Sequence, residues 1–133
     1  MGGGYFEQLD FIYSPARDVA AECDYFAHVL RGRVAFRIEG MGARVAMIEL
    51  AQGPPHLLLA DHLDGERPIL IYRVADLARA VADLDAHGWG PARAVEIPMG
   101  PCRSFVTPGG HRLALYQLTR PDVARHFEGR HDF

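Results

Sequence analysis

The sequence predicts an α+β fold in which two tandem βαβββ modules form a curved mixed sheet around a cleft. Three observations predict it: a β-rich run followed by a helical pattern occurs twice, three strand-like segments follow each occurrence, and tight turns separate those segments. The two patterns begin at Phe11 and Ile69. Because 133 residues suit one globular domain, we expect a single domain with modules at 5–62 and 67–118 and a tail at 119–133.

Each module contains one amphipathic helical pattern. Asp18 and Asp76 stand at the predicted N-caps, since an aspartate carboxylate accepts hydrogen bonds from the free amides of a first turn. The apolar residues at helical spacing are Val19, Cys23, Phe26 and Leu30 in the first helix and Leu77, Val81 and Leu84 in the second. Gly88 stands where a C-terminal cap would fall. Both helices are therefore predicted to bury one face.

Three strand-like segments follow each predicted helix. They lie at 33–39, 43–50 and 56–62 in the first module and at 92–98, 102–107 and 111–118 in the second. Glycine and proline residues in "GMG", "AQGPP", "MGP" and "PGG" separate them. The repeated unit is therefore β-α-β-β-β.

The composition excludes several classes of function. A net charge of -3 without a basic stripe excludes the electrostatic footprint of a nucleic-acid binder. No apolar run approaches the ~20 residues that span a bilayer, and the start lacks the features of a signal peptide, so we expect a cytoplasmic protein without a membrane partner. A reducing compartment would keep Cys23 and Cys102 as thiols. All basic residues are arginine, which excludes lysine chemistry and leaves arginine as an anion clamp.

The order and spacing of these elements resemble the vicinal-oxygen-chelate superfamily, which includes glyoxalases, bleomycin-resistance proteins and extradiol dioxygenases. The resemblance rests on "DVAAECDYFAHVLRG", "VADLARAVADLDAHGWG" and "VTPGGHRLALYQL", and it extends from about Phe6 to Leu118. It implies a glyoxalase/bleomycin-resistance-like fold and, because most members are homodimers, a homodimer. Thr107 replaces the aspartate of the family's closing turn, and its hydroxyl can still accept a turn amide.

In metal-dependent members of this superfamily, His, Glu or Gln side chains hold a divalent ion on the first and last strands of each module. The resemblance places these positions at Phe11, Leu58, Ile69 and Ala114. Their side chains carry no donor atoms, so we expect neither a metal nor a cofactor. A shift of the register by one residue recovers at most Asp10 as a ligand.

Strand alternation adds polar residues to the predicted cleft. The candidate ligand-binding residues are Phe11, Tyr13, His56, Leu58, Ile69, Arg73, Arg112, Ala114 and Tyr116. The two arginines and two tyrosines of this set could clamp a carboxylate or phosphate and hydrogen-bond a ring or carbonyl. Alternatively, the arginines reach solvent at the strand ends. His56 could be an acid, a base or a ligand, or only a histidine at a strand entrance.

The remaining histidines and the second cysteine are not predicted to take part in binding or catalysis. The histidines expected at the surface are His28, His62, His87 and His111. Cys102 is expected to be a small buried strand residue rather than a reactive thiol. The tail, which contains His126 and His131, could fold over the cleft or pack on a partner subunit, but we expect a solvated end.

The loss of all four ligand positions favours metal-independent binding of a small organic molecule in an apolar and aromatic cleft. The alternative is a lyase, isomerase or dioxygenase of the same superfamily, working through ligands such as Asp10 and His56 or through metal-free acid–base catalysis. No catalytic residue is identified. A third hypothesis is a module whose cleft is filled by its own side chains and whose role is protein association, and exposed sheet edges make a dimer physically reasonable.

Overall fold

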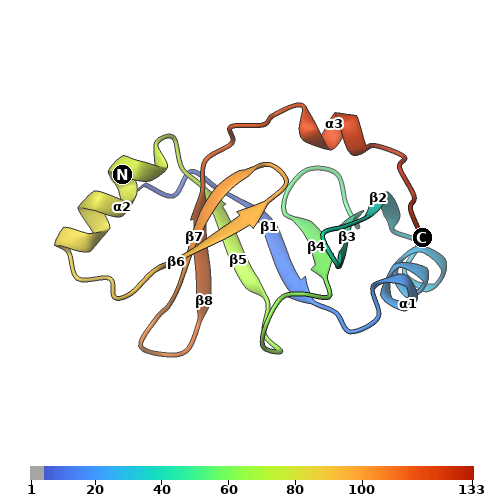
Figure 1. The fold of residues 1–133 in the computed structure, drawn as a ribbon, viewed down its shortest axis with the longest axis horizontal. Helices are drawn as coiled ribbons and strands as arrows, with labels where there is room; N and C mark the ends of the chain where they lie inside the picture. Colours follow the sequence, from blue (N-terminus) through green and yellow to red (C-terminus); the bar gives the residue numbers. More distant parts are fainter. Residues whose placement is uncertain (1–4) are drawn as a thin grey trace. The chain divides into compact units, whose positions relative to one another are not determined.

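A computed structural model describes residues 5–133, the side chain of Glu96 excepted (Figure 1). Contacts between backbone positions divide the chain into two compact units. The first module, Phe11–Pro68, forms one unit together with Arg125–Phe133. The second module, Ile69–Ala124, forms the other unit together with the described residues up to Asp10. Each module has the order β-α-β-β-β, which confirms the predicted fold class.

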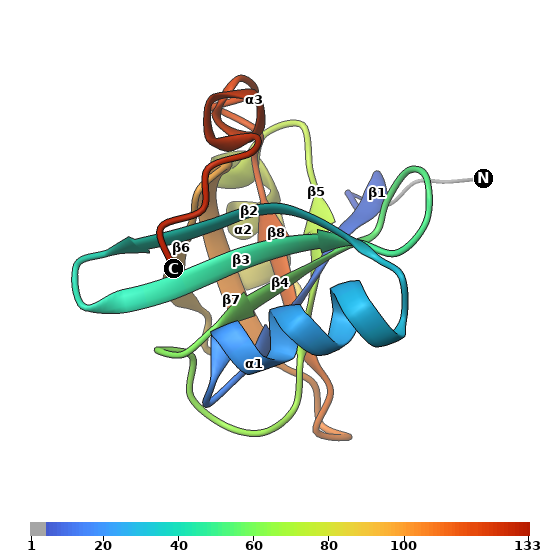
Figure 2. The same cartoon turned by 90° about the vertical axis from the view of Figure 1, so that its right-hand side faces the viewer.

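The first module is a four-stranded sheet with a helix on one face. Its elements are β1 (Gln8–Pro15), α1 (Val19–Asp24), the π-helix η1 (Tyr25–Val29), β2 (Arg33–Gly40), β3 (Ala43–Glu49) and β4 (His56–Ala60). The strand order is β2-β3-β4-β1, antiparallel except for the parallel pair of β1 and β4. Figure 2 shows α1 lying across this sheet. Val19 and Cys23 of the helix are buried there in one cluster with Ile48 and Leu59 of the strands.

The helix of the first module begins as predicted but ends differently. The Ala21 amide donates to Asp18 Oδ1 at 3.0 Å, which is the predicted N-cap bond. After Asp24 the helix continues as η1, in which each turn holds more residues than an α-helix. The α-helical spacing therefore fails beyond Phe26, and Leu30 is 46% exposed instead of buried. The predicted apolar stripe was wrong at this one position.

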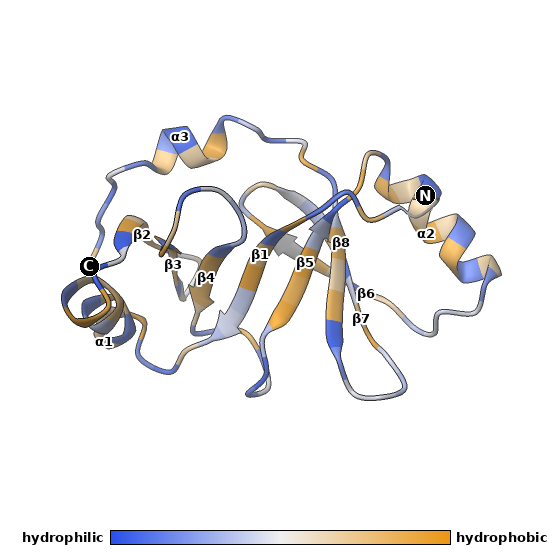
Figure 3. Ribbon diagram, turned by 180° about the vertical axis from the view of Figure 1, so that it is seen from behind, coloured by the Kyte–Doolittle hydropathy of each residue, from blue (hydrophilic) through white to orange (hydrophobic). Residues whose placement is uncertain are grey.

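The second module repeats the arrangement. Its elements are β5 (Ile69–Arg73), α2 (Leu77–Ala86), β6 (Arg93–Ile97), β7 (Gly100–Val106) and β8 (Arg112–Tyr116). The strand order is β5-β8-β7-β6, with β5 and β8 parallel. The Arg79 amide donates to Asp76 Oδ1 at 3.1 Å, and Gly88 has the positive φ of 74° that a helix C-cap requires. Figure 3 shows hydrophobic and hydrophilic residues alternating along α2, as expected for a helix with one buried face.

The end of the chain is not the solvated tail that the sequence predicted. The helix α3 (Val123–Phe127) leads into residues 129–133, which pair with the outer edge of β2. Figure 2 shows this segment reaching β2. The prediction failed because the pairing uses backbone groups, while the side chains of 128–132 stay exposed as their polar composition indicates.

The surface and core assignments of the other singled-out residues agree with the sequence. The exposed histidines are His28, His62, His87 and His111, as predicted. Cys23 and Cys102 are both buried, which confirms Cys102 as a buried strand residue. Among the described residues, no helix has the length and apolar character needed to cross a membrane.

Candidate functional site

Asp10 is a buried carboxylate in the unit of the second module, with 6% of its surface exposed. Tyr116 Oη donates to Asp10 Oδ2, and Gln8 Nε2 donates to Asp10 Oδ1, both at 2.5 Å. Arg73 Nε lies 3.6 Å from Asp10 Oδ2. A buried carboxylate is tolerated when donors and a cation surround it, and Asp10 has both.

Strand pairing brings these residues together. Arg73 and Tyr116 are direct partners in the parallel register of β5 and β8, and the Val74 amide donates to the Tyr116 carbonyl at 2.9 Å. The Glu7 amide donates to the Arg73 carbonyl, also at 2.9 Å, so the chain before Asp10 runs beside the end of β5. Three segments that are distant in sequence therefore meet at one buried carboxylate.

The electrostatics of this cluster set the charge of each group. Burial raises the pKa of the Tyr116 phenol well above its ordinary value, and the hydrogen bond to Asp10 raises the pKa further. Tyr116 is therefore a neutral donor. The Arg73 guanidinium has two carboxylates near its Nε, Asp10 at 3.6 Å and Glu7 at 3.8 Å. These two carboxylates balance its charge, so Arg73 is poorly suited to clamp an anion.

The two arginines of the predicted clamp stand at opposite ends of one strand pair. Arg112 pairs with Val106 at the start of β8, whereas Arg73 pairs with Tyr116 at its end. Four residues of strand separate the two ends, on the order of 13 Å. The structure thus brings Arg73 to Tyr116 and Asp10, and it leaves Arg112 at the opposite end of the strand pair.

The first module contributes a second pair of polar candidates. Tyr13 is buried, and its Oη lies 3.4 Å from Nε2 of the exposed His62. His56 stands opposite Phe11 in the register of β1 and β4, with ring centroids 6.4 Å apart. The Nδ1 atom of His56 is buried and has no hydrogen-bond partner among the described residues. A buried polar atom without a partner is unusual and suits contact with a ligand or a water molecule.

Comparison with known proteins gives relatives in structure only. No family model matches the chain, and no curated protein sequence matches it. Methylmalonyl-CoA epimerase from Mycobacterium tuberculosis is 16% identical with a TM-score of 0.72, and the match covers 91% of this chain and 94% of that one. Catechol 2,3-dioxygenase is 15% identical with a TM-score of 0.62, covering 86% of this chain and 40% of that one. The chain has the vicinal-oxygen-chelate fold.

A third solved structure supports the same assignment. Methylmalonyl-CoA epimerase from Streptomyces coelicolor, in complex with 2-nitronate-propionyl-CoA, is 18% identical with a TM-score of 0.66. The match covers 86% of this chain and 99% of that one. At identities this low, the structural match shows the fold alone. The activity of this chain must be argued from its own residues.

The four positions that the sequence resemblance assigns to metal ligands are apolar and buried. Phe11 and Leu58 are 6% and 0% exposed in the first module, and Ile69 and Ala114 are 2% and 0% exposed in the second. None carries a donor atom, so this residue set does not fit a divalent ion. Within residues 5–133, no group of three or more His, Cys, Asp and Glu side chains could hold a metal ion.

Only part of this site was predictable from the sequence. Tyr116, Arg73 and Tyr13 were predicted as site residues, whereas Asp10 was predicted only as a possible metal ligand. Gln8 and the contact of Tyr13 with His62 were not predicted. One signal was present: Asp10 is an acidic residue next to the apolar run of β1, and such a residue needs donors if it is buried. The identity of those donors depends on pairing between distant strands.

Proposed function

We propose that this protein binds a small organic molecule in an apolar and aromatic site without a metal ion. The observation that supports the proposal is the residue set at the four positions that the resemblance assigns to metal ligands, Phe11, Leu58, Ile69 and Ala114, all of them buried and without donor atoms. Chemistry that depends on a polarising ion has no support from these residues. Apolar side chains with a few polar groups nearby are the surroundings that organic molecules prefer, and each module supplies such side chains at these positions.

The polar groups near these positions support recognition rather than reaction. His56 presents a buried Nδ1 atom that has no partner within residues 5–133 and can form one hydrogen bond to a ligand. Tyr13 and Tyr116 add phenol groups on strands that also carry the apolar positions. The proposal includes a cytoplasmic homodimer without nucleic-acid or membrane partners, in keeping with the net charge of -3.

A binding screen with metal removed tests the proposal. The purified protein, treated with EDTA, is screened by thermal shift against uncharged aromatic amides and aromatic carboxylates, and hits are titrated by calorimetry. We expect saturable binding that EDTA leaves unchanged. His56→Ala should weaken a hit by roughly tenfold, the cost of one hydrogen bond, while the exposed turn residue variant His111→Ala should not. Stoichiometric Ni, Zn, Fe or Mn in the purified protein, held by side chains, would overturn the proposal.

One observation favours a second candidate, an enzyme that uses metal-free acid–base catalysis. Asp10 and Tyr116 form a buried pair with a 2.5 Å hydrogen bond. However, Asp10 is only 6% exposed and already has two hydrogen-bond donors, which leaves it little room to take a proton from a substrate. The enzyme would be favoured if wild type exchanges a proton of a bound compound for solvent deuterium. In that case Asp10→Asn should bind the compound equally well but no longer catalyse the exchange.

A further inference from the structure

We propose that the outer edge of β2 is a docking site for an extended peptide with an aspartate followed by a phenylalanine, and that residues 129–133 of this chain occupy the site as an internal ligand. This proposal concerns the first module and its bound segment alone, and it does not depend on the proposed function.

The segment binds β2 as an added strand. The Gly129 amide donates to the Ala35 carbonyl at 2.8 Å, the Arg37 amide donates to the Arg130 carbonyl at 2.8 Å, and the Asp132 amide donates to the Arg37 carbonyl at 2.7 Å. Arg37 and His131 form a parallel bridge. Extended peptides bind other proteins in this way, by main-chain hydrogen bonds to an open sheet edge.

Phe133 anchors the segment. Its ring packs against the buried cluster that includes Val19 and Cys23 of α1. The guanidinium carbons of Arg37 and Arg44 lie 4.8 and 4.6 Å from the ring centroid. Two cations over one aromatic ring give a cation–π contact that an aliphatic residue could not replace. This arrangement makes the position selective for an aromatic side chain.

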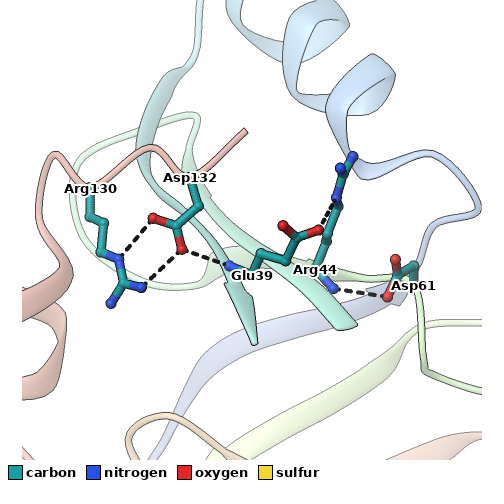
Figure 4. Close-up of polar contacts among 5 residues, drawn as sticks. All are labelled: Glu39, Arg44, Asp61, Arg130 and Asp132. Atoms are coloured by element: carbon teal, nitrogen blue, oxygen red, sulfur yellow. Dashed lines mark hydrogen bonds and ion pairs between the residues drawn. The ribbon is translucent and has the colours of Figure 1, made fainter. Parts of the chain in front are cut away.

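A second subsite holds the aspartate. The Glu39 amide of β2 donates to Asp132 Oδ2 at 2.9 Å, and Arg130, within the segment itself, orients the carboxylate by donating to both of its oxygens at 2.9 Å (Figure 4). Arg44 is fixed independently of the segment, because its Nε donates to Glu39 Oε1 at 2.9 Å and its amide donates to Asp61 Oδ1 at 3.0 Å. The groups of β2 and β3 that meet the segment are therefore held by bonds within the module.

The way the segment is attached allows it to leave without unfolding of the module. Residues 128–132 and the preceding connection 119–122 are exposed, and the contact of the segment with the core is made by the partly buried Phe133. Segments with few buried contacts open with low free energy. Once residues 129–133 detach, β2 is an open sheet edge, which pairs readily with another extended segment.

A labelled peptide tests the site directly. The peptide GRHDF, amidated at its end and carrying a fluorophore at its start, is titrated by fluorescence anisotropy with the chain truncated after Glu128 and with the full chain. We expect saturable binding to the truncated chain and binding at least about tenfold weaker to the full chain, because its own segment competes at a high effective concentration. Peptides with Asp132→Asn or Phe133→Ala should bind at least about tenfold more weakly. The His131→Ala peptide is the matched control and should bind unchanged, since the His131 side chain is exposed.

A second variant keeps the test decisive if the truncated chain does not fold. The full-length Phe133→Ala chain loses the anchor but keeps every backbone group, and it should bind the wild-type peptide more tightly than the full wild-type chain does. Circular dichroism confirms that each variant is folded. The proposal is wrong if a folded variant does not bind the peptide, or if full-length wild type binds the peptide as tightly as the variants do. It is also wrong if the truncated chain self-associates and the peptide does not dissociate the assembly.

Discussion

The Asp10 carboxylate shows how a single residue can be buried at an acceptable cost. Its burial would be strongly unfavourable without partners, and it is compensated by Tyr116, Gln8 and the nearby Arg73 guanidinium. The same contacts occupy its lone pairs. Asp10 therefore contributes to the stability of the second module's unit, and we expect its loss to appear first in stability measurements.

Replacing Tyr116 with phenylalanine removes one of the donors to Asp10 and changes little else in the core. A buried acceptor that loses a hydrogen bond to a charged group costs about 1.5–3 kcal/mol, so Tyr116→Phe should lower the free energy of unfolding by that amount. Urea denaturation followed by circular dichroism measures the change. Tyr25→Phe is the control, because Tyr25 is 52% exposed, and its stability should change by no more than about 0.5 kcal/mol. Equal effects of the two substitutions would contradict the structural role of Tyr116.

The same phenol predicts a loss of stability at alkaline pH. Its pKa is raised in the folded chain, mainly by burial, above the ordinary value of 10.0. The stabilisation is therefore complete below pH 10.0 and decreases as the pH rises toward the higher folded-state pKa, because the unfolded chain releases the proton first. The free energy of unfolding should fall more steeply above pH 10.0 in wild type than in Tyr116→Phe. Parallel pH profiles would show that Tyr116 titrates normally.

Residue patterns predicted the sheet face on which a side chain lies, but they did not predict the residue with which that side chain forms a hydrogen bond. Alternation placed Tyr116 on the same face as Ala114, and both are buried. The partner of Tyr116, however, is Asp10, which lies 106 residues away in sequence. Alternation likewise did not show that Arg73 and Arg112 stand at opposite ends of the β5–β8 pair. Alternation fixes the face of a residue but not its position along a strand relative to another strand.

At the scale of elements, local capping chemistry was the most reliable signal. Asp18 and Asp76 both accept a first-turn amide, as their positions before apolar stripes predicted. The π-helix was not predictable from the spacing, because one continuous helical stripe is formed by Val19, Cys23, Phe26 and Leu30. The β2 edge was missed as well, since a segment that pairs through its backbone needs no apolar pattern.

Asp76 should account for a measurable part of the stability of α2. Asp76→Ala removes the acceptor for the Arg79 amide and should lower the free energy of unfolding by about 1 kcal/mol. Asp76→Ser supplies another capping oxygen and should recover most of the loss. Thermal and urea denaturation of the three proteins measure the difference. If serine is no better than alanine, the carboxylate acts through its charge and not through the cap.

One contact that attaches residues 129–133 to β2, the hydrogen bond from the Glu39 amide to Asp132, should weaken at acidic pH. The hydrogen bonds from Arg130, and then that from the Glu39 amide, lower the pKa of the Asp132 carboxyl below its ordinary value of 3.8. The stabilisation from Asp132 is thus present above pH 3.8 and is lost as the pH falls through the lower folded-state pKa. The NMR shift of the Glu39 amide should follow this titration in wild type. In Asp132→Asn it should stay constant, and a shift that persists there would assign the titration to another group.

At the scale of the whole molecule, the repeat made the fold predictable. Two copies of β-α-β-β-β constrain each other, because an error in one strand would have to recur at the same place in the other. No second copy of the site constrains the prediction of function in the same way. The superfamily resemblance assigned four positions to metal ligands, and the apolar residues there argue against metal binding without identifying a ligand or a reaction.

The two cysteines provide one chemical probe for each half of the molecule. Cys23 lies in the first module and Cys102 in the second, with 0% and 2% of their surfaces exposed, and burial raises the pKa of the Cys23 thiol. In the folded chain both thiols should react with an aromatic disulfide reagent at least about a thousandfold more slowly than free cysteine, because reaction requires opening of a stable core. The single variants Cys23→Ala and Cys102→Ala isolate each rate.

Removal of residues 129–133 should then affect the two thiols differently. Phe133 packs against the cluster that contains Cys23, so the truncated chain should expose Cys23 more often and raise its rate of labelling. Cys102 lies in the other unit and should react at the wild-type rate. A parallel rise of both rates would mean that the segment stabilises the chain as a whole, and unchanged rates would mean that Phe133 does not protect the first core.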